Sequence, residues 1–205
     1  MKKVVIIDSI GGNVGSVYRT VNRLKFPAVC SSDVDDILQA SHIIMPGVGH
    51  FGHAMKRLKE NNLIDTLNES VLIKKIPVLG ICLGMQLMAR FSEEGNAEGL
   101  GWFDAEVLRF QFNDKKVFKT PHVGWNSIES NKKSVFFNGL NTEDQFYFVH
   151  SYYVKCKFKE DVLATSHYEQ TFTSVIQKEN MLGVQFHPEK SFDAGDFLLR
   201  NFLMD

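Results

Sequence analysis

A cysteine between two glycines is the first residue of the chain that could act as a nucleophile. The segment reads Gly80-Ile81-Cys82-Leu83-Gly84 and stands between an apolar run typical of a β-strand and a run that favours a helix, Met85–Arg90. A strand that turns sharply into a helix lifts the intervening side chain above the sheet, and glycines permit such a turn. The N-terminus of the helix favours the thiolate, which is the reactive form of cysteine. For this motif alone, a buried structural cysteine is the alternative.

A His-Pro-Glu segment near the C-terminus supplies the groups that such a nucleophile requires. The apolar run Met181–Phe186 is typical of a strand and leads into His187, which Pro188 keeps out of the helical conformation. Because residues two apart on an extended chain face the same side, we expect Glu189 to lie beside the imidazole and orient it. Cys82, His187 and Glu189 would then serve as nucleophile, base and orienting carboxylate. A surface turn after a core strand is the alternative for the His-Pro-Glu segment alone.

Together the two motifs resemble the catalytic triad of the class I (triad-type) glutamine amidotransferases, and the resemblance covers nearly the whole chain. Two longer strings, Pro121-His122-Val123-Gly124-Trp125-Asn126 and Tyr147-Phe148-Val149-His150-Ser151-Tyr152, are similar to the glutaminase subunits of imidazole glycerol phosphate synthase, a histidine-biosynthesis enzyme. The resemblance implies a flavodoxin-like α/β core with a mixed, largely parallel central sheet. It also implies hydrolysis of L-glutamine to glutamate and ammonia by Cys82, His187 and Glu189.

An oxyanion hole is the next part that amide hydrolysis needs, because negative charge develops on the oxygen of the substrate carboxamide. The backbone N–H of Leu83, the residue after the nucleophile, is one expected donor. The resemblance implies that Pro46-Gly47-Val48-Gly49 forms the oxyanion loop and that the N–H of Val48 is the second donor. Gly47 and Gly49 flank Val48, which makes a flip of the peptide sterically easy and predicts a partner-driven switch. An ordinary turn after a strand is the alternative.

The α-amino and α-carboxylate groups of glutamine require polar anchors. Gln86 lies one helical turn beyond Cys82, so we expect its side chain to face the same pocket, and a solvated helix residue is the alternative. The resemblance places His150, Ser151 and Tyr152 at the glutamine site. We interpret His150 as a structural or pocket-lining histidine and not as the base, because no orienting acid follows it as Glu189 follows His187.

Glutaminases of this family pass their ammonia to a synthase. The resemblance implies a heterodimer with a (β/α)8 barrel cyclase that makes imidazole glycerol phosphate and AICAR. It places Asn13, Trp125, Tyr147 and Lys190 at or near the interface; for Trp125 a core aromatic is the alternative. The first loop, Asp8–Asn13, departs from the family, which usually has Tyr-Gly after the aspartate.

Three other functions remain open from the sequence. A paralogue with the same triad could pass ammonia to a different barrel synthase, such as one that amidinates a surface sugar. A stand-alone cysteine hydrolase or peptidase would need neither Gln86 nor the Pro46–Gly49 loop and would act without a partner. A non-catalytic regulatory subunit would have no need for an intact Cys82, His187 and Glu189 together.

Length, composition and net charge limit the classes of protein and partner that the sequence allows. The 205 residues are 44% hydrophobic and include 17 Phe, which suits one glutaminase domain over residues 1–205. A net charge of −1 gives no electrostatic reason to expect a nucleic-acid or membrane partner. Cys30, Cys82 and Cys156 are widely spaced, and His50 and His53 have no third ligand nearby, so we expect no disulfide framework, metal or cofactor. These features, with no signal peptide or membrane span expected, predict a cytoplasmic protein.

The elements that position these residues follow from the apolar pattern. In the first half, short apolar runs, of which Val4–Ile7 is wholly β-branched, alternate with segments whose apolar residues recur at helical spacing. This alternation predicts a parallel sheet covered by helices. The expected strands are Val4–Ile7, Pro27–Cys30, Ile43–Met45 and Pro77–Ile81, and the expected helices are Asn13–Lys25, Asp35–Ala40 and Gly52–Ser70. In the second half, short alternating runs predict antiparallel strands. These are Val107–Phe112, Val117–Phe118, Phe146–Val149, Tyr152–Cys156, Leu163–His167 and Thr173–Gln177, with a solvated loop at Lys155–Asp161 and a closing helix at Asp193–Leu203.

Overall fold

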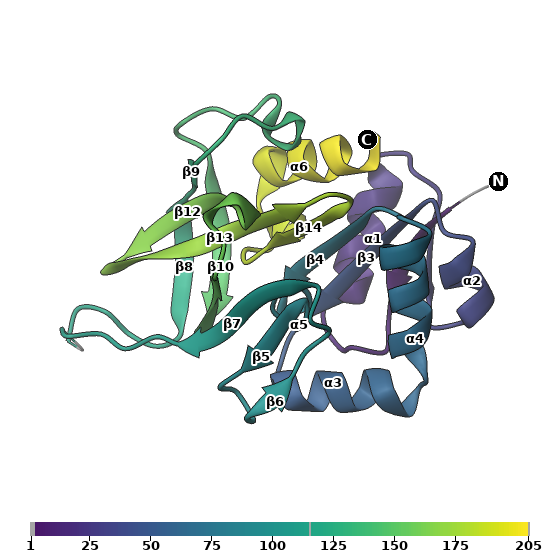
Figure 1. The fold of residues 1–205 in the computed structure, drawn as a ribbon. Coiled ribbons are helices and arrows are strands. Elements are labelled where there is room, and N and C mark those ends of the chain that lie inside the picture. The colour runs from purple at the N-terminus through teal and green to yellow at the C-terminus, as the bar shows by residue number, and fades with distance from the viewer. Residues whose placement is uncertain (1–2, 115, 205) are drawn as a thin grey trace.

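Two regions with different strand geometry make up the protein. The structure is a computed structural model and describes residues 3–114 and 116–204. Figure 1 shows parallel strands surrounded by helices on the side that carries both termini, and a group of antiparallel strands, β8, β10, β12 and β13, on the other side. This arrangement confirms the expected α/β fold with added antiparallel strands in the second half.

The parallel region is a sheet of five adjacent strands in the order β2-β1-β3-β4-β14, counted over the described residues. Their bounds are β1 (Val4–Ile7), β2 (Ala28–Ser31), β3 (His42–Gly47), β4 (Val78–Cys82) and β14 (Met181–Val184). Every residue of β1, β4 and β14 is buried, as expected for parallel strands covered on both faces. The sheet therefore brings the ends of β3, β4 and β14 together, and these ends carry the residues of the predicted site.

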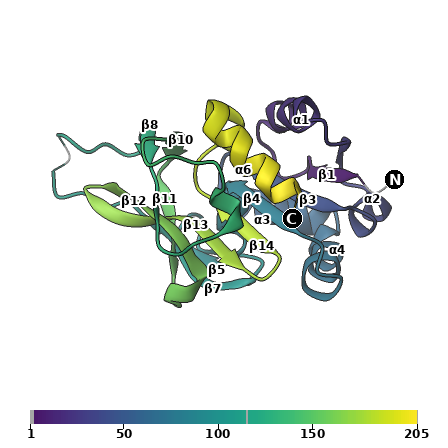
Figure 2. The ribbon, with the colours of Figure 1, turned by 90° about the horizontal axis from the view of Figure 1, so that it is seen from above.

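Alternate residues of these strands face two separate hydrophobic cores. Val5 and Ile7 face the core shared with α2 (Val34–Leu38), α3 (Phe51–Glu60) and α4 (Leu63–Asn68). Val4 and Ile6 face the core shared with α1 (Val14–Arg23) and α6 (Phe192–Met204). Seen from above in Figure 2, α1 and α6 lie on one side of the parallel strands and α4 on the other. The two faces of each strand are thus buried by different helices, which holds the sheet edge rigidly.

The expectation of one helix over Gly52–Ser70 is wrong. The chain forms α3 and α4 and then a π-helical turn, η1 (Glu69–Ile73). Asn62 adopts a left-handed conformation with φ of 55°, and the side chain of Asn61 donates to the carbonyl of Arg57 at the end of α3. Asparagine is one of the few residues that tolerates this conformation, so the Asn61-Asn62 pair ends the first helix and redirects the chain.

The antiparallel region continues the same sheet beyond β14. The strands added there are β5 (Ala89–Ser92), β6 (Ala97–Glu98), β7 (Phe103–Arg109), β9 (Glu129–Ser130), β11 (Tyr152–Cys156), β12 (Val162–Tyr168) and β13 (Gln170–Lys178). The expected strand Val107–Phe112 is shifted, since β7 ends at Arg109. The strand expected at Val117–Phe118 is wrong, because the Asp114 carboxylate accepts hydrogen bonds from the N–H groups of Lys116 and Val117 and turns the chain.

A separate two-stranded ribbon packs against this sheet. It consists of β8 (His122–Ser127) and β10 (Gln145–His150), which run antiparallel with Trp125 opposite Tyr147 and His122 opposite His150. One face of the ribbon is buried and carries His122, Phe146, Phe148 and His150, whereas the other carries the exposed Val123 and Trp125. No strand is expected from the sequence over β8, although β8 contains most of the Pro121–Asn126 motif.

The remaining short elements are single 3₁₀ turns: η2 (Val135–Phe137), η3 (Lys159–Asp161) and η4 (Pro188–Lys190). The solvated loop expected at Lys155–Asp161 is wrong at both ends, because Lys155 belongs to β11 and Asp161 is buried. Burial raises the pKa of the Asp161 carboxyl above its ordinary value. Among the described residues, no helix combines the length and the apolar character that a membrane crossing requires.

Candidate active site

Cys82 stands at the sharpest turn of the parallel region. It is the last residue of β4 and the N-cap of α5 (Leu83–Leu87), with φ of 55° and ψ of −109°. A non-glycine residue in this region is strained, and such strain is concentrated at functional sites. The strained conformation therefore lies on Cys82 itself, and neither Gly80 nor Gly84 has a positive φ.

The flanking glycines instead allow close packing of the backbone. A Cβ at Gly84 would lie 1.7 Å from the carbonyl oxygen of Met45, and one at Gly80 would lie 2.7 Å from the backbone of Gly84. Any side chain at either position would force β3, β4 and α5 apart. The two glycines therefore let α5 start directly against β3, which holds the nucleophile beside the expected oxyanion loop.

The helix expected at Met85–Arg90 is wrong after its first turn. α5 ends at Leu87, and Ala89–Ser92 forms β5, which pairs with β7. The carbonyls of Leu87 and Ala89 accept hydrogen bonds from Leu100 and Gly101 of a later loop, so they are not available to extend the helix. Gln86 still falls inside α5 and is buried, which excludes the solvated alternative.

His187 and Glu189 form a buried pair next to Cys82. The Nδ1 atom of His187 lies 2.8 Å from Oε1 of Glu189, and the two side chains are only 2% and 1% exposed. His187 has the extended conformation expected before proline, but Glu189 lies on the 3₁₀ turn η4 and not on an extended segment. The 3₁₀ turn still brings its carboxylate back to the imidazole, so the predicted contact forms by a different route.

Two opposing effects act on the pKa of His187. Burial lowers this pKa, but hydrogen bonding and charge interactions with Cys82 and Glu189 outweigh burial and raise the pKa to about 9. The other ring nitrogen, Nε2, is buried and has no partner in ordinary hydrogen-bond geometry among the described residues. Cys82 is one of the groups that raise this pKa, so the imidazole lies within interaction range of the sulfur of Cys82. An imidazole in this position can exchange a proton with a group held at the sulfur.

A cavity of about 350 Å³ opens at the sulfur of Cys82. Its walls combine residues from both halves of the chain: Val48, Gly49, Cys82, Leu83, Gln86, Glu94, Pro121, Val149, His150, Ser151 and Tyr152. The cavity thus brings together the nucleophile, the expected oxyanion loop and every residue expected to bind glutamine. Its size suits a small amino acid and its derivatives.

The Gly47–Gly49 segment lies directly beside α5. A Cβ at Gly47 would lie 3.0 Å from Cβ of Leu83, whereas Gly49 has φ of 107° and open space around it. Only Gly49 therefore combines a left-handed conformation with room to move, and Gly47 is needed for close approach. The side chain of Val48 is 46% exposed, and a Cβ at Gly12 of the first loop would lie 3.3 Å from the backbone nitrogen of Val48.

Sequence reasoning missed two side chains of the site. Gln185 is completely buried, and its Nε2 lies 3.6 Å from the sulfur of Cys82. Glu94 lines the cavity, and its Oε2 accepts a hydrogen bond from the backbone N–H of Phe51, the first residue of α3. Gln185 precedes His187 by two residues, so the same alternation that was applied to Glu189 could have found it. Glu94 carries no such local signal.

Hydrogen bonds join the buried polar residues of the cavity. Gln86 donates through Nε2 to the carbonyl of Tyr152 at 3.1 Å and to Oε1 of Gln185 at 3.0 Å. His150 donates from Nδ1 to the same carbonyl at 2.8 Å, and its Nε2 lies 3.0 Å from Nδ1 of His122. Three of the expected pocket residues, Gln86, His150 and Tyr152, therefore belong to one connected network, which includes a histidine from the β8 motif.

Three of the residues expected at a partner interface lie together near His187. Trp125, which is 43% exposed, meets Tyr147 with ring centroids 5.9 Å apart, and the ammonium of Lys190 lies 5.5 Å from the centroid of the Tyr147 ring. The carbonyl of Tyr147 accepts a hydrogen bond from the backbone N–H of His187. The alternative of Trp125 as a core aromatic is therefore excluded. Asn13 is the N-cap of α1, a helix that contacts the η4 turn.

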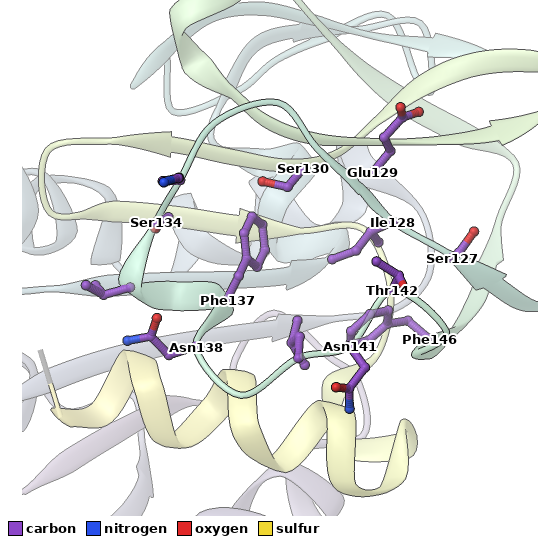
Figure 3. A pocket seen from close by; sticks show the side chains of 13 residues that line it. Ser127, Ile128, Glu129, Ser130, Ser134, Phe137, Asn138, Asn141, Thr142 and Phe146 are labelled. Atoms are coloured by element: carbon purple, nitrogen blue, oxygen red, sulfur yellow. The ribbon is translucent and has the colours of Figure 1, made fainter.

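A larger hollow, of about 920 Å³, lies elsewhere, between the segment 127–142 and Phe146. Figure 3 shows side chains such as those of Ile128, Phe137 and Phe146 around it. None of its lining residues is a cysteine or a histidine. Size therefore does not mark the chemically equipped cavity. Among the described residues, no three His, Cys, Asp or Glu side chains are grouped as a metal site would require.

The fold and the elbow define a class of α/β enzyme that has a cysteine nucleophile on a strand–turn–helix. The profile of the family "Glutamine amidotransferase class-I" matches residues 5–205 of the chain. The chain belongs to this family, since the match covers almost its whole length.

Comparison with individual curated relatives shows which members of this family the chain resembles. The chain is 46% identical over 200 residues to "Imidazole glycerol phosphate synthase subunit HisH 2" of Methanococcus maripaludis, which covers 98% of each chain. It is 42% identical to the HisH 2 subunit of Pseudomonas aeruginosa, again covering 98% of each, and 42% identical to a HisH 1 subunit of Campylobacter jejuni.

Solved structures share the fold at lower identity. A crystal structure of a glutamine amidotransferase superimposes with a TM-score of 0.74 at 20% identity, covering 98% of this chain and 97% of that one. A glutamine amidotransferase from Thermotoga maritima gives a TM-score of 0.63 at 20% identity, covering 98% and 96%. These likenesses support the fold alone.

Proposed function

We propose that the chain is the glutaminase subunit of imidazole glycerol phosphate synthase and acts through Cys82, His187 and Glu189. The observation that carries this proposal is the buried His187–Glu189 pair beside a cysteine on a strained elbow, in a chain that is 46% identical to a HisH subunit. The thiolate attacks the carboxamide carbon of L-glutamine and forms a tetrahedral intermediate. His187 gives its proton to the departing nitrogen, ammonia leaves, and a thioester remains on the sulfur.

The second half of the reaction uses the same three residues. His187, now neutral, takes a proton from a water molecule as that water attacks the thioester carbon, and glutamate leaves as the sulfur departs as thiolate. Glu189 accepts the Nδ1–H hydrogen bond of His187, which orients the ring and stabilises its charged form. The oxyanion accepts hydrogen bonds from the N–H of Leu83 and, in the active state, from that of Val48.

The cavity walls suggest how the substrate is oriented. Both amide hydrogens of Gln86 are used within the protein, so only its Oε1 remains to accept a hydrogen bond from glutamine. Glu94 uses one carboxylate oxygen to bond the start of α3, which leaves the other to face the α-ammonium group. Ser151 and Tyr152, which are partly exposed beside the buried His150, bind the α-carboxylate end.

Ammonia from this site would pass to a (β/α)8 barrel cyclase, the partner subunit in a heterodimer whose glutaminase part is the single domain 1–205. The patch of Trp125, Tyr147 and Lys190, together with Asn13, forms the contact with that partner. Because Tyr147 holds the backbone of His187 and the first loop touches Val48, a partner bound here can influence both the base and the oxyanion loop. The proposed reaction takes place in the cytoplasm and uses no cofactor.

A paralogue that feeds another barrel synthase is the second candidate. Several relatives carry numbered names, HisH 1 or HisH 2, which implies more than one such subunit in their organisms. The Ser9-Ile10 departure in the first loop lies next to the oxyanion loop and toward the proposed interface. The two candidates share a triad and differ in the partner that stimulates it.

The experiment measures glutamate released from L-glutamine by the purified chain alone and with a cyclase subunit and its nucleotide ligand. We expect low basal turnover and a rise of about 10²–10³, the value of one oxyanion donor. Gly49→Val should depress stimulated turnover far more than basal turnover, because a β-branched residue resists the left-handed conformation. Gly101→Val, which changes a glycine of positive φ in open space outside the cavity, is the matched control.

The outcomes separate the candidates. Stimulation by the histidine-pathway cyclase supports the leading proposal. Stimulation only by a different barrel from the same organism would favour the paralogue. Full activity without any partner would contradict the switch and favour a stand-alone hydrolase.

A further inference from the structure

A chain of hydrogen bonds ends on the sulfur of Cys82, and its last donor has no role in the triad. The chain runs from His122 to His150, to the carbonyl of Tyr152, to Gln86, to Gln185 and then to Cys82. Five of these six residues are buried, and Gln185 is completely inaccessible to solvent. The residues come from β8, β10, β11, α5, the residue after β14 and the end of β4, so they connect the antiparallel region to the nucleophile.

The orientation of each amide in this chain follows from one backbone group. The carbonyl of Tyr152 can only accept, so Nδ1 of His150 and Nε2 of Gln86 must both donate to it. The second hydrogen on Nε2 of Gln86 then points at Gln185, which lies 3.0 Å away and accepts through Oε1. The amide of Gln185 is thereby turned so that its NH₂ group, and not its oxygen, faces the sulfur at 3.6 Å.

An amide NH₂ aimed at a sulfur distinguishes between the two forms of that sulfur. It donates to a thiolate as a charge-assisted hydrogen bond, which is stronger than a bond to a neutral group, and it gains little from a thiol. Because Gln185 is completely buried, its free hydrogens have no water as a substitute partner, and leaving them unbonded is costly. The amide of Gln185 therefore stabilises the anion before substrate arrives and again when the thioester breaks, and it opposes the carbonyl of Val149, which lies 3.9 Å from the sulfur and can accept only from the thiol.

We propose that Gln185 is a further catalytic residue, which stabilises the Cys82 thiolate through its side-chain amide and is held in that orientation by Gln86 and the Tyr152 carbonyl. This inference rests on the proposed function, in which Cys82 is the nucleophile. It assigns to the cavity a donor that acts on the sulfur, in addition to the oxyanion donors that act on the substrate.

The experiment is the rate of Cys82 alkylation by iodoacetamide as a function of pH, followed by mass spectrometry of the Cys82 peptide in the full-length protein. In Gln185→Met, which keeps the volume but removes the donor, the rate at pH 7 should fall about 10- to 100-fold. The pH at half-maximal rate should rise by about one to two pH units. The limiting rate at high pH should stay the same or increase, because a more basic thiolate is the stronger nucleophile.

Two further variants separate this role from a structural one. Gln185→Glu keeps an acceptor for Gln86 and replaces the donor with a carboxylate, so it should move the midpoint to higher pH even if Gln185→Met fails to fold. Asn201→Ala removes an amide that donates to the carbonyls of Phe136 and Asn138, and the described site includes none of these residues. It should lose stability and keep the wild-type pH profile.

Two kinds of result would contradict this proposal, and they differ in whether the glutaminase proposal survives. A wild-type profile in both Gln185 variants, or a uniform loss of rate at every pH, would overturn the role of Gln185 and leave the glutaminase proposal standing. If wild-type Cys82 reacts no faster than Cys30 and Cys156, the nucleophile assignment fails, and the role of Gln185 fails with it.

Discussion

Histidines occupy two regions around Cys82, and their neighbours give them opposite properties. His187, at the end of the parallel sheet, contacts Cys82 and Glu189, and its pKa is raised to about 9 against the effect of burial. His122 and His150, on the β8–β10 ribbon, face each other, and burial lowers their pKa values to about 4 and about 3. The same ring is thus charged where anions surround it and neutral where only a carbonyl and another imidazole do.

The comparison separates the histidine that takes part in the reaction from the two that hold the cavity wall in place. A histidine that holds its proton at neutral pH beside a nucleophile can deliver that proton to a leaving group. A neutral pair with one fixed direction of donation, from His122 through His150 to the Tyr152 carbonyl, instead positions the polar wall of the cavity. Four predictions test this division, beginning with the variant of largest expected effect.

Removing the charged histidine should abolish the reaction. We expect His187→Asn to lower stimulated glutaminase turnover by about 10⁴-fold or more, as expected when one member of a catalytic unit is lost. Cys82→Ser should be equally damaging, and the double variant hardly worse. His150→Asn should cost less than about 10²-fold, since it removes support and not the base. This division is wrong if steady-state assays show a larger loss of turnover for His150→Asn than for His187→Asn.

Neutralising the orienting carboxylate should have an intermediate effect. Glu189→Gln keeps an oxygen that can accept the Nδ1–H bond but removes the charge, so we expect a loss of about 10²–10³-fold. The pKa of His187, followed by NMR, should fall because an anionic neighbour is gone. An unchanged His187 titration would show that Glu189 does not determine its charge.

Removing His122, which lies at the end of the hydrogen-bond chain farthest from Cys82, should mainly lower the stability of the protein. His122→Phe fits an aromatic environment that already includes Phe148 and Tyr168, but it leaves Nε2 of His150 without its donor. We expect the free energy of unfolding in urea to fall by about 1–3 kcal/mol, the cost of an unsatisfied buried polar group. kcat/KM for glutamine should fall by less than about tenfold. A loss of activity as large as that of Glu189→Gln would place His122 in the chemistry.

The smallest effect is a pH dependence of stability with opposite signs in the two regions. The pKa values of His122 and His150 are lower in the folded protein than in the unfolded chain, so the unfolded chain binds protons first and stability is lost as pH falls from about 6.5 toward 4. The pKa of His187 is higher in the folded protein, so its contribution is full below about 6.5 and is lost as pH rises toward 9.

Unfolding in urea at several pH values checks this prediction. Compared with wild type, His122→Phe should flatten the acid side of the profile and His187→Asn should flatten the alkaline side. Identical profiles in the two variants would mean that the two regions do not differ in charge.

The local parts of the site could be predicted from the sequence because they depend on short segments. Cys82 between glycines requires only a strand, a turn and a helix, and His187 with Glu189 requires only three consecutive residues. The buried runs Val4–Ile7 and Val78–Ile81, which contain no polar side chain, likewise indicate a parallel sheet, because a strand covered on both faces needs apolar residues throughout. The flanking glycines provide room for the turn, as expected, and the strained conformation lies on Cys82 itself.

Tertiary structure alone decided which distant residues share the cavity. Gln185 bonds to Gln86 across 99 positions of sequence, and the two histidines of the ribbon meet because β8 pairs with β10 in one register. The end of α5 at Leu87 was decided by a loop that takes its carbonyls, and no propensity of Met85–Arg90 records that loop. Local pattern reports the conformation that a segment prefers, whereas hydrogen-bond partners and burial are set by how the segments pack.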